Sequence, residues 1–376
     1  MRIARVCMFA GMAAWAVLMT PPMARAGGIT PAITIINTAP GGDGYTFTNF
    51  DGPVPSTTAG TGTNMNGISN TGVAVGFSTP DGATLTNFTA NPLTSTAANV
   101  LNINGSTAAM ALGINSAGTV VGTDGNGNAF SLSNGTVTIL PTAGTPAMAF
   151  GINDRGMIVG QETVGNTTPG FLLNGTTLTT INAPTGSNSD IVNAQGINNN
   201  GLIVGFYAGN DGNQHGFMAN ASSASGGVIT GTAITDPTIP TTLPGEPAGT
   251  TFVFSQILGI NDHGLAVGYY GDSTGSQHGF LYNTLTGQYT FLDDPDARID
   301  THLGTVITQI TGINNNDEIT GFYSDANGVF HGFVATVPEP GSMVLMGLGL
   351  AGVAALARDR WRRGLRQLAR EPARGD

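Results

Sequence analysis

Short apolar runs alternate with polar, glycine-rich segments along most of the chain, and both kinds of segment recur at intervals. Residues 256–260 and 265–270 are apolar runs, separated by the polar turn sequence Asn-Asp-His-Gly at 261–264. Asparagine at the first position of a turn and glycine at the fourth favour a type I turn, around which hairpins are often built. A second hairpin is predicted from the runs 278–283 and 288–292. One such unit therefore contains four predicted antiparallel strands.

This unit occurs six times. The copies open at six glycines: Gly67, Gly113, Gly151, Gly196, Gly259 and Gly312. Nine positions after each stands another glycine: Gly76, Gly122, Gly160, Gly205, Gly268 and Gly321. A phenylalanine then follows in each copy: Phe88, Phe130, Phe171, Phe217, Phe280 and Phe333. Such regularity predicts one repeated supersecondary unit with the phenylalanine in its core. Ser69 replaces the turn asparagine in the first copy, and Asp317 replaces the turn glycine in the last.

The repeated unit and the two ends of the repeat region predict the fold class. Four antiparallel strands in roughly 40 to 60 residues match one propeller blade. The sixth copy stops after its third strand, 331–337, and the N-terminal segment 44–51 resembles the fourth-strand segment 288–293. We expect an all-β, six-repeat β-propeller-like body of four-stranded antiparallel blades, with the N-terminal strand completing the last blade. The alternative is an open β-solenoid or a two-sheet array. Extra length between copies is expected in surface loops, notably 222–250.

The N-terminus has the pattern of a secretory signal. Two arginines precede an apolar segment at 6–19, and Ala24 and Ala26 are small residues at the two positions that a signal peptidase reads. The sequence predicts a signal peptide with an apolar helix over 1–26, cleaved before Gly27. The one cysteine, Cys7, lies inside this segment, so the body is expected to be stable without disulfides.

The C-terminus has the pattern of a membrane segment. Residues 341–357 carry no charge, and this length is at the lower limit for a transmembrane helix. Arginines follow at Arg358, Arg360, Arg362 and Arg363, which would hold that end on the cytoplasmic side. The body, 27–337, would then lie outside the cytoplasm, and 338–376 would form a separate tail.

The tail also resembles a known sorting signal. Pro338, Glu339 and Pro340 stand just before the apolar segment, and the basic cluster stands just after it. This order is similar to the PEP-CTERM signal of Gram-negative bacteria, which the membrane protease exosortase recognises. The resemblance implies exosortase as a partner and transient anchoring in the membrane through the tail. It also implies sorting to the outer surface or extracellular matrix (the biofilm matrix), in contact with extracellular polysaccharide.

The repeats resemble the bacterial HAF repeat of extracellular proteins. The resemblance rests on the Gly-Ile-Asn and Val-Gly-Phe-Tyr patterns, and on His-Gly-Phe at 215–217, 278–280 and 331–333. It covers roughly residues 67–337. It implies an exported repeat protein and adds no specific chemistry.

Charge narrows the possible partners of the body. The chain has no lysine, and residues 27–337 contain only two arginines, Arg155 and Arg298, against 19 acids, for a formal charge of −17. A surface of that sign repels phosphate backbones and anionic lipid, which argues against nucleic-acid binding. Divalent cations and neutral glycans are the contacts that remain.

Acidic and amide side chains in the loops between hairpins are candidate calcium ligands. Calcium takes six to eight oxygen ligands, and the candidates are Asp124, Asn126, Asn128, Asp211, Asp272 and Asp325. The alternative is that these residues form ordinary Asx turns. Asp293, Asp294 and Asp296 form the densest acidic cluster and are open to both interpretations.

Three histidines occupy one repeat position: His215, His278 and His331. They could ring a metal ion, or each could satisfy a turn at the start of a third strand. The second interpretation is favoured because the other copies keep the phenylalanine and lack the histidine, and because a structural metal needs a tight set of four ligands.

No catalytic motif is visible in the sequence. A nucleophile elbow, a phosphate-binding loop with lysine and a His-Glu-x-x-His metal motif are all missing from it. We therefore expect a non-enzymatic scaffold. One alternative is a calcium-dependent glycan-binding adhesin that uses the acidic loops. Another is a polysaccharide hydrolase or lyase that uses two carboxylates.

Overall fold

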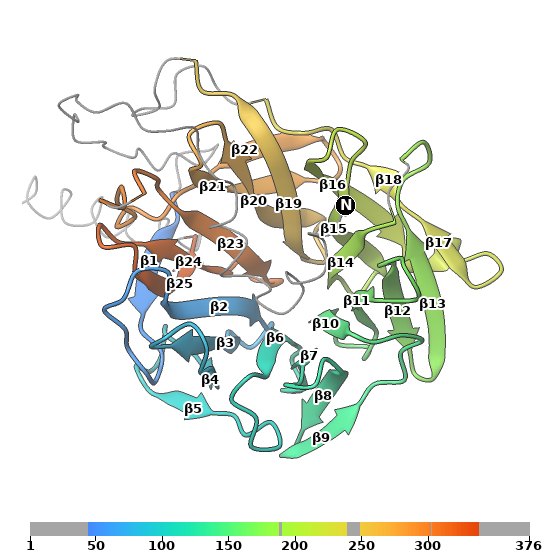
Figure 1. Ribbon diagram of the computed structural model, residues 1–376, viewed down its shortest axis with the longest axis horizontal. Helices are drawn as coiled ribbons and strands as arrows, with labels where there is room; N and C mark the ends of the chain where they lie inside the picture. The colour runs from blue at the N-terminus through green and yellow to red at the C-terminus, as the bar shows by residue number, and fades with distance from the viewer. Residues whose placement is uncertain (1–43, 188–189, 239–248, 302, 338–376) are drawn as a thin grey trace, which may run out of the picture.

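The computed structural model describes residues 44–187, 190–238, 249–301 and 303–337, which form 25 strands and one short 3-10 helix, η1 (Ala221–Ser223) (Figure 1). The predicted all-β class with several antiparallel sheets is confirmed. The predicted signal peptide with Ala24 and Ala26, the residues Pro338, Glu339 and Pro340, and the apolar segment 341–357 lie outside the described residues. Within the described ranges, no helix is long and apolar enough to span a membrane.

The strands of the first three copies form three four-stranded units. Sheet 1 contains β2 (Gly62–Ile68), β3 (Ala74–Thr79), β4 (Thr86–Ala90) and β5 (Ala98–Val100). Sheet 2 contains β6 (Met110–Ile114), β7 (Val120–Thr123), β8 (Ala129–Ser133) and β9 (Thr136–Ile139). Sheet 3 contains β10 (Ala147–Ile152), β11 (Ile158–Glu162), β12 (Gly170–Asn174) and β13 (Thr177–Asn182). Each unit is a meander of antiparallel neighbours, as the repeat predicts.

The last three copies form three more units. Sheet 4 contains β14 (Val192–Ile197), β15 (Leu202–Ala208), β16 (Gln214–Asn220) and β18 (Thr232–Ala233). Sheet 5 contains β19 (Phe252–Ile260), β20 (Leu265–Asp272), β21 (Gln277–Asn283) and β22 (Gln288–Phe291). Sheet 6 contains β23 (Thr308–Ile313), β24 (Ile319–Ser324), β25 (Phe330–Thr336) and β1 (Thr46–Phe50). In Figure 1 the six units follow one another around a common centre.

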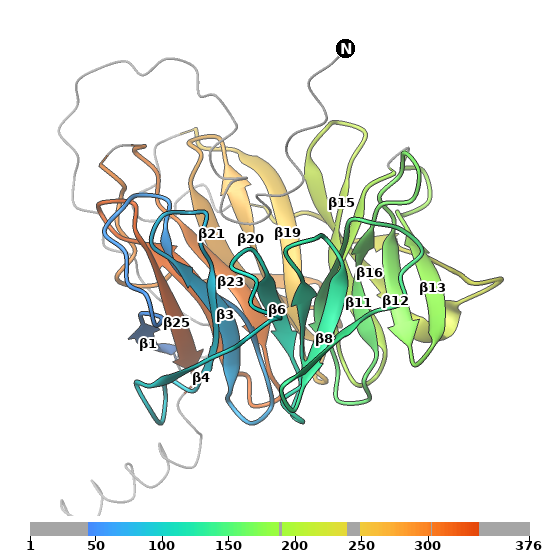
Figure 2. The same cartoon turned by 60° about the horizontal axis from the view of Figure 1, so that its bottom comes forward.

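The N-terminal strand completes the sheet of the last copy. β1 pairs antiparallel with β25 over five positions, from Thr46 opposite Thr336 to Phe50 opposite Gly332. Figure 2 shows the same two strands side by side at one edge of the molecule. The predicted pairing of the N-terminal segment with the third strand of the sixth copy is therefore confirmed. A single parallel bridge between Gly62 and Phe330 also links β2 to β25, so sheets 6 and 1 are continuous.

The turn of each first hairpin is closed by a hydrogen bond between its first and fourth residues. In sheet 3, the N–H of Gly156 donates to the carbonyl of Asn153 at 3.0 Å, and the same bond recurs in all six copies. The glycine at the fourth position has a positive φ, +76° at Gly156. Asp317 adopts a similar left-handed conformation, with φ of +58°, which a non-glycine residue seldom does. The substitution in the sixth copy therefore keeps the shape of the turn.

The opening glycines contact one another around the centre of the molecule. A Cβ atom placed on each would lie 3.0 to 3.4 Å from the Cα of the opening glycine in the next copy. These contacts run in chain order from Gly67 to Gly312, and the last one joins Gly312 back to Gly67. Because the inner strands of neighbouring copies meet backbone to backbone at this position, a side chain there would separate them.

The apolar core lies between neighbouring sheets. The six repeat phenylalanines are all fully buried, as predicted. Phe217 of sheet 4, for example, belongs to a cluster with Val159 and Leu172 of sheet 3. Phe333 of sheet 6 likewise packs in a cluster with Val267 of sheet 5. Each sheet therefore buries one face against the sheet before it.

The segment predicted as a surface loop, 222–250, is only partly a loop. Thr232 and Ala233 form β18, the fourth strand of sheet 4, and β17 (Val228–Thr230) pairs parallel with β13 of sheet 3. Ile229 is fully buried and Ile234 is 5% exposed, so apolar packing holds the segment against the sheets. The loop prediction was wrong for these two strands. β18 takes the place of the fourth strand of the repeat, and β17 is an additional strand; with two and three residues, both are too short to show an alternating pattern in the sequence.

Candidate functional site

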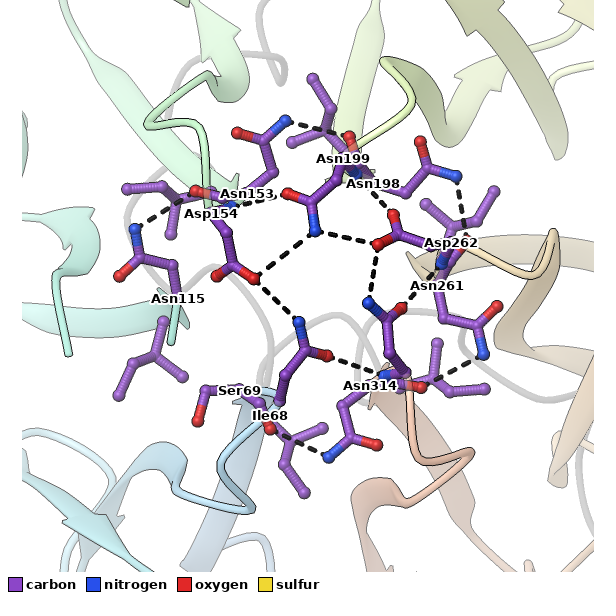
Figure 3. Close-up of a pocket in the computed structure, with 17 residues that line it drawn as sticks. Ile68, Ser69, Asn115, Asn153, Asp154, Asn198, Asn199, Asn261, Asp262 and Asn314 are labelled. Atoms are coloured by element: carbon purple, nitrogen blue, oxygen red, sulfur yellow. Dashed lines mark hydrogen bonds between the residues drawn. The ribbon is translucent and has the colours of Figure 1, made fainter. Parts of the chain in front are cut away.

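The six first-hairpin turns meet at one end of the central axis and form a polar depression (Figure 3). We call it the turn pocket; its lining comes from the Ile-Asn-x segments of the turns, where Asn is Ser69 in the first copy. The isoleucines form its apolar part, and the two following positions supply amides, carboxylates and a hydroxyl. Its free volume is about 60 Å³, enough for a few waters or one small group.

The turn asparagines link each copy to the next. The side-chain Nδ2 of each donates to the backbone carbonyl of the equivalent residue in the following copy. These bonds join Asn115 to Asn153 (3.2 Å), Asn153 to Asn198 (2.9 Å), Asn198 to Asn261 (2.9 Å), Asn261 to Asn314 (3.1 Å) and Asn314 to Ser69 (2.9 Å). The Oδ1 atom accepts from backbone N–H groups of its own turn, such as those of Asn200 and Leu202 in the fourth copy. The repeated asparagine therefore holds its own turn and the ring of turns together.

The residues that directly follow the turn asparagines form a second set of hydrogen bonds between neighbouring copies, which we call the second belt. Except at Ser116, their side chains accept from the backbone N–H of the preceding copy, for example Asp154 from Ser116 at 2.8 Å and Asp262 from Asn199 at 2.7 Å. Asn199 lies between the two carboxylates and donates to Oδ2 of Asp262 at 2.9 Å and of Asp154 at 3.4 Å. Asn70 also donates to Oδ2 of Asp154, at 2.9 Å. Figure 3 shows Asn199 between Asp154 and Asp262. Both carboxylates are thus held by amide donors.

The surroundings of Asp154 in the turn pocket favour its ionised form. Burial works against ionisation of Asp154, but hydrogen bonds from Ser116, Asn70 and Asn199 lower the pKa of its carboxyl. A general acid in glycoside hydrolysis needs the opposite, a carboxyl with a raised pKa. Asp154 can therefore accept hydrogen bonds from a polar group but is poorly suited to donate a proton.

The second belt was missed at the sequence level. Each copy has a short polar residue directly after the turn asparagine position: Asn70, Ser116, Asp154, Asn199, Asp262 and Asn315. This polar position recurs when the six repeat sequences are aligned. Its meaning depends on the turns meeting at one axis, which the sequence alone does not give.

The predicted calcium ligands belong to four separate sheets, 2, 4, 5 and 6. Asp272 is the last residue of β20, and the others lie in loops. Each of the four aspartates accepts backbone N–H bonds within its own loop, as the Asx-turn alternative proposed. At Asp124, burial opposes ionisation, but bonds from Asn128 and Asn126 lower the pKa of the carboxyl. In the part of the chain that the structure describes, no three His, Cys, Asp or Glu side chains are grouped as a metal site would require. Calcium binding by these loops stays a prediction.

The three repeat histidines each lie between two aspartates. Their Nδ1 atoms are 2.7 Å from a carboxylate at the end of a fourth strand or just after it: His215 to Asp236, His278 to Asp293 and His331 to Asp51. Their Nε2 atoms face the candidate calcium ligands: His215 to Asp211 at 3.0 Å, His278 to Asp272 at 3.7 Å and His331 to Asp325 at 3.7 Å. The hydrogen bond with Asp51 raises the pKa of His331. Each histidine therefore joins two loops of its own sheet.

The acidic cluster Asp293, Asp294 and Asp296 contains one carboxyl in an unusual environment. Asp294 is fully buried, and its Oδ2 has no partner among the described residues. Burial raises its pKa to about 7. Because the folded pKa exceeds that of the unfolded chain, Asp294 is expected to lower the stability progressively as pH rises from about 4 to about 7.

The variant Asp294→Asn is therefore expected to be more stable than the parent at pH 8, by up to about 4 kcal/mol, and nearly equal to it at pH 4. Urea unfolding at both pH values measures the difference. Asp190→Asn is the control, because Asp190 is exposed and is not among the groups that shift the pKa of Asp294. An equal effect of Asp294→Asn at the two pH values would contradict the assignment.

Comparison with known protein families identifies a sorting signal at the C-terminal end of the described residues and beyond it. The PEP-CTERM protein-sorting motif matches residues 336–363. No curated protein matches the sequence. The resemblance of the repeats to the HAF repeat stays a prediction.

Three solved structures are distantly similar. TolB from Acinetobacter baumannii has 10% identity and a TM-score of 0.41 over 70% of this chain, but the match spans only 63% of TolB. Aleuria aurantia lectin in complex with alpha-methyl-L-fucoside has 9% identity and a TM-score of 0.40, covering 78% of this chain and 95% of the lectin. The same lectin with Fucalpha1-6GlcNAc has 9% identity and a TM-score of 0.39, covering 82% and 97%. These similarities are too low to assign a function. The PEP-CTERM match confirms the predicted sorting signal, and it implies export and a membrane-anchored sorting tail.

Proposed function

We propose that this chain is an exported, non-enzymatic protein of the cell surface or extracellular matrix. Its body acts as a scaffold, and exosortase processes its tail. The observation that carries the proposal is the PEP-CTERM motif at 336–363, which begins at the last residue of β25 (Phe330–Thr336). The tail therefore follows directly from the strand that β1 covers, so that body and sorting signal are adjacent in the chain.

We propose further that the body is a six-bladed, β-propeller-like ring. Three observations support this: six four-stranded units, the cycle of contacts that returns from Gly312 to Gly67, and the pairing of β1 with β25. A closed ring of this kind has no inner sheet edge open to other chains. That property suits a protein that stays folded outside the cell without disulfides.

The proposal that the body is non-enzymatic is supported by the hydrogen bonds of the side chains in the turn pocket, which are made within the protein. The turn asparagines and the residues after them hydrogen-bond one copy to the next. Asp154 and Asp262 share Asn199 as a donor, which fits a structural belt better than a pair of catalytic carboxylates. The hydrolase alternative needs one carboxyl with a raised pKa, whereas the pKa of Asp154 is lowered.

The sorting proposal is tested by replacing Pro338 and Pro340 with alanine. In a host with exosortase, the parent is expected to yield a shorter species without the tail, whereas the double variant stays at full length in the membrane fraction. Intact mass and cell fractionation measure both. The control replaces the exposed prolines Pro53 and Pro55 with alanine, which should leave processing unchanged. Normal processing of the Pro338 and Pro340 variant would refute exosortase recognition of this signal.

A further inference from the structure

A second, smaller cavity lies on the axis, one position before the ring of opening glycines. Each copy contributes one lining residue: Asn66, Leu112, Phe150, Gln195, Leu258 and Thr311. All six are buried, the most exposed being Asn66 at 8%. The cavity volume is about 20 Å³, which is enough for one water and too small for a larger ligand.

Two amide groups that line this cavity lack a partner among the described residues. Asn66 donates from Nδ2 to the carbonyl of Ala111 at 3.0 Å, so its orientation is fixed and its Oδ1 is left as an unpaired acceptor. Gln195, which is 5% exposed, has an unpaired Nε2. A buried polar group without a hydrogen bond costs about 1 to 3 kcal/mol, so two of them around one cavity call for an occupant.

Thr311 supplies a third polar atom. Its hydroxyl donates to the carbonyl of Met65 at 2.6 Å, which leaves the oxygen lone pairs of Thr311 available as acceptors. The other lining groups are apolar side chains. The occupant therefore meets one donor, Gln195, and two acceptors, Asn66 and Thr311.

This set of groups selects the chemistry of the occupant. A cation would meet the N–H groups of Gln195, and an anion would meet the oxygens of Asn66 and Thr311. A water can accept from Gln195 and donate to both oxygens, which gives the three hydrogen bonds typical of a buried water. We propose that the axial cavity binds a single structural water that bridges sheets 1, 4 and 6. The water would tie opposite sides of the ring together across its axis.

A crystal structure of the mature protein at about 1.5 Å resolution or better tests the proposal. The expected result is one density peak on the axis, about 2.7 to 3.2 Å from Asn66 Oδ1, Gln195 Nε2 and Thr311 Oγ1. An empty cavity would overturn the proposal. So would a peak with several oxygen ligands at about 2.4 Å, because such distances indicate a metal ion.

A measurement in solution keeps the test independent of the crystal. Oxygen-17 magnetic relaxation dispersion counts waters with long residence times. The variant Gln195→Leu is expected to have one fewer such water than the parent, because it removes the donor. The control Gln288→Leu changes an exposed glutamine on β22 and should leave the count unchanged. If the folded Gln195→Leu protein has the same number of long-lived waters as the parent, the proposal is wrong. If that variant does not fold, the crystal structure of the parent tests the proposal.

Discussion

Replacement of Gly205 by alanine is expected to lower the free energy of unfolding by more than about 4 kcal/mol, or to prevent folding. A bulge between Ala194 and Gly196 shifts the register of β14 against β15. It places the backbone carbonyl of Asn193 against the Cα of Gly205, where an added Cβ would overlap the oxygen. The same Cβ would lie 2.8 Å from a ring carbon of the buried Phe217.

Neither neighbour can move without disrupting sheet 4. The carbonyl belongs to the backbone of the innermost strand, and Phe217 is fully buried between sheets 3 and 4. The other five copies show the same approach of a carbonyl to the glycine, for example Gln256 to Gly268. The bulge in the first hairpin of each copy therefore requires a glycine nine positions after the opening glycine.

Gly212→Ala is the matched control for Gly205→Ala. Gly212 lies in the loop between β15 and β16 of the same sheet, with a positive φ of +86° and nothing within 4 Å of an added Cβ. Its replacement should cost only the left-handed backbone strain, about 1 to 2 kcal/mol. Urea unfolding followed by circular dichroism compares the two variants. Equal stability of the two variants would show that the bulge does not form as described.

The sequence predicted the repeated unit well because its signals are local. The turn from Asn153 to Gly156 needs only residues within one hairpin, and the spacing to Phe171 counts residues within one copy. The bulge at Ala149 was not predicted, because a period-two pattern does not reveal an inserted residue. β17 and β18 were missed for a related reason: with three and two residues, they are too short to show an alternating pattern.

The sites were harder to predict because they combine distant residues. Asp211 was selected as an oxygen ligand, but its partner His215 on β16 is also bonded to Asp236, which follows the fourth strand. His331 pairs with Asp51, 280 positions away, and only the pairing of β1 with β25 brings them together. The sequence identified these polar side chains, and the tertiary fold determined what they bond to.

Removal of residues 44–50 from the full chain is expected to destabilise the body by about 5 kcal/mol, because it removes two packed phenylalanines and a paired strand. The deletion removes β1, and with it five residue pairs to β25. It also removes the ring contact of Phe47 with Phe333 at 5.1 Å and that of Phe50 with Phe88 at 5.6 Å. Burial of one phenylalanine contributes about 1.5 to 3 kcal/mol, and Phe50 is only 7% exposed.

The deletion has a second consequence, because β25 becomes an edge strand. An exposed edge with unpaired N–H and C=O groups promotes association between chains. We therefore expect the deleted protein to unfold at lower temperature and to form oligomers by size-exclusion chromatography. The matched control removes the equally peripheral β5 (Ala98–Val100), whose residues are partly or fully exposed and which does not join the two ends of the repeat region.

A synthetic peptide with residues 44–51 distinguishes strand closure from general damage. If β1 closes the ring by pairing with β25, the added peptide should restore the monomer and raise the melting temperature of the deleted protein. A peptide of the same composition in scrambled order should do neither, because Phe47 and Phe50 must face Phe333 and Phe88 in register. A deleted protein that keeps the melting temperature of the parent and stays monomeric would favour the open array of sheets over the closed ring.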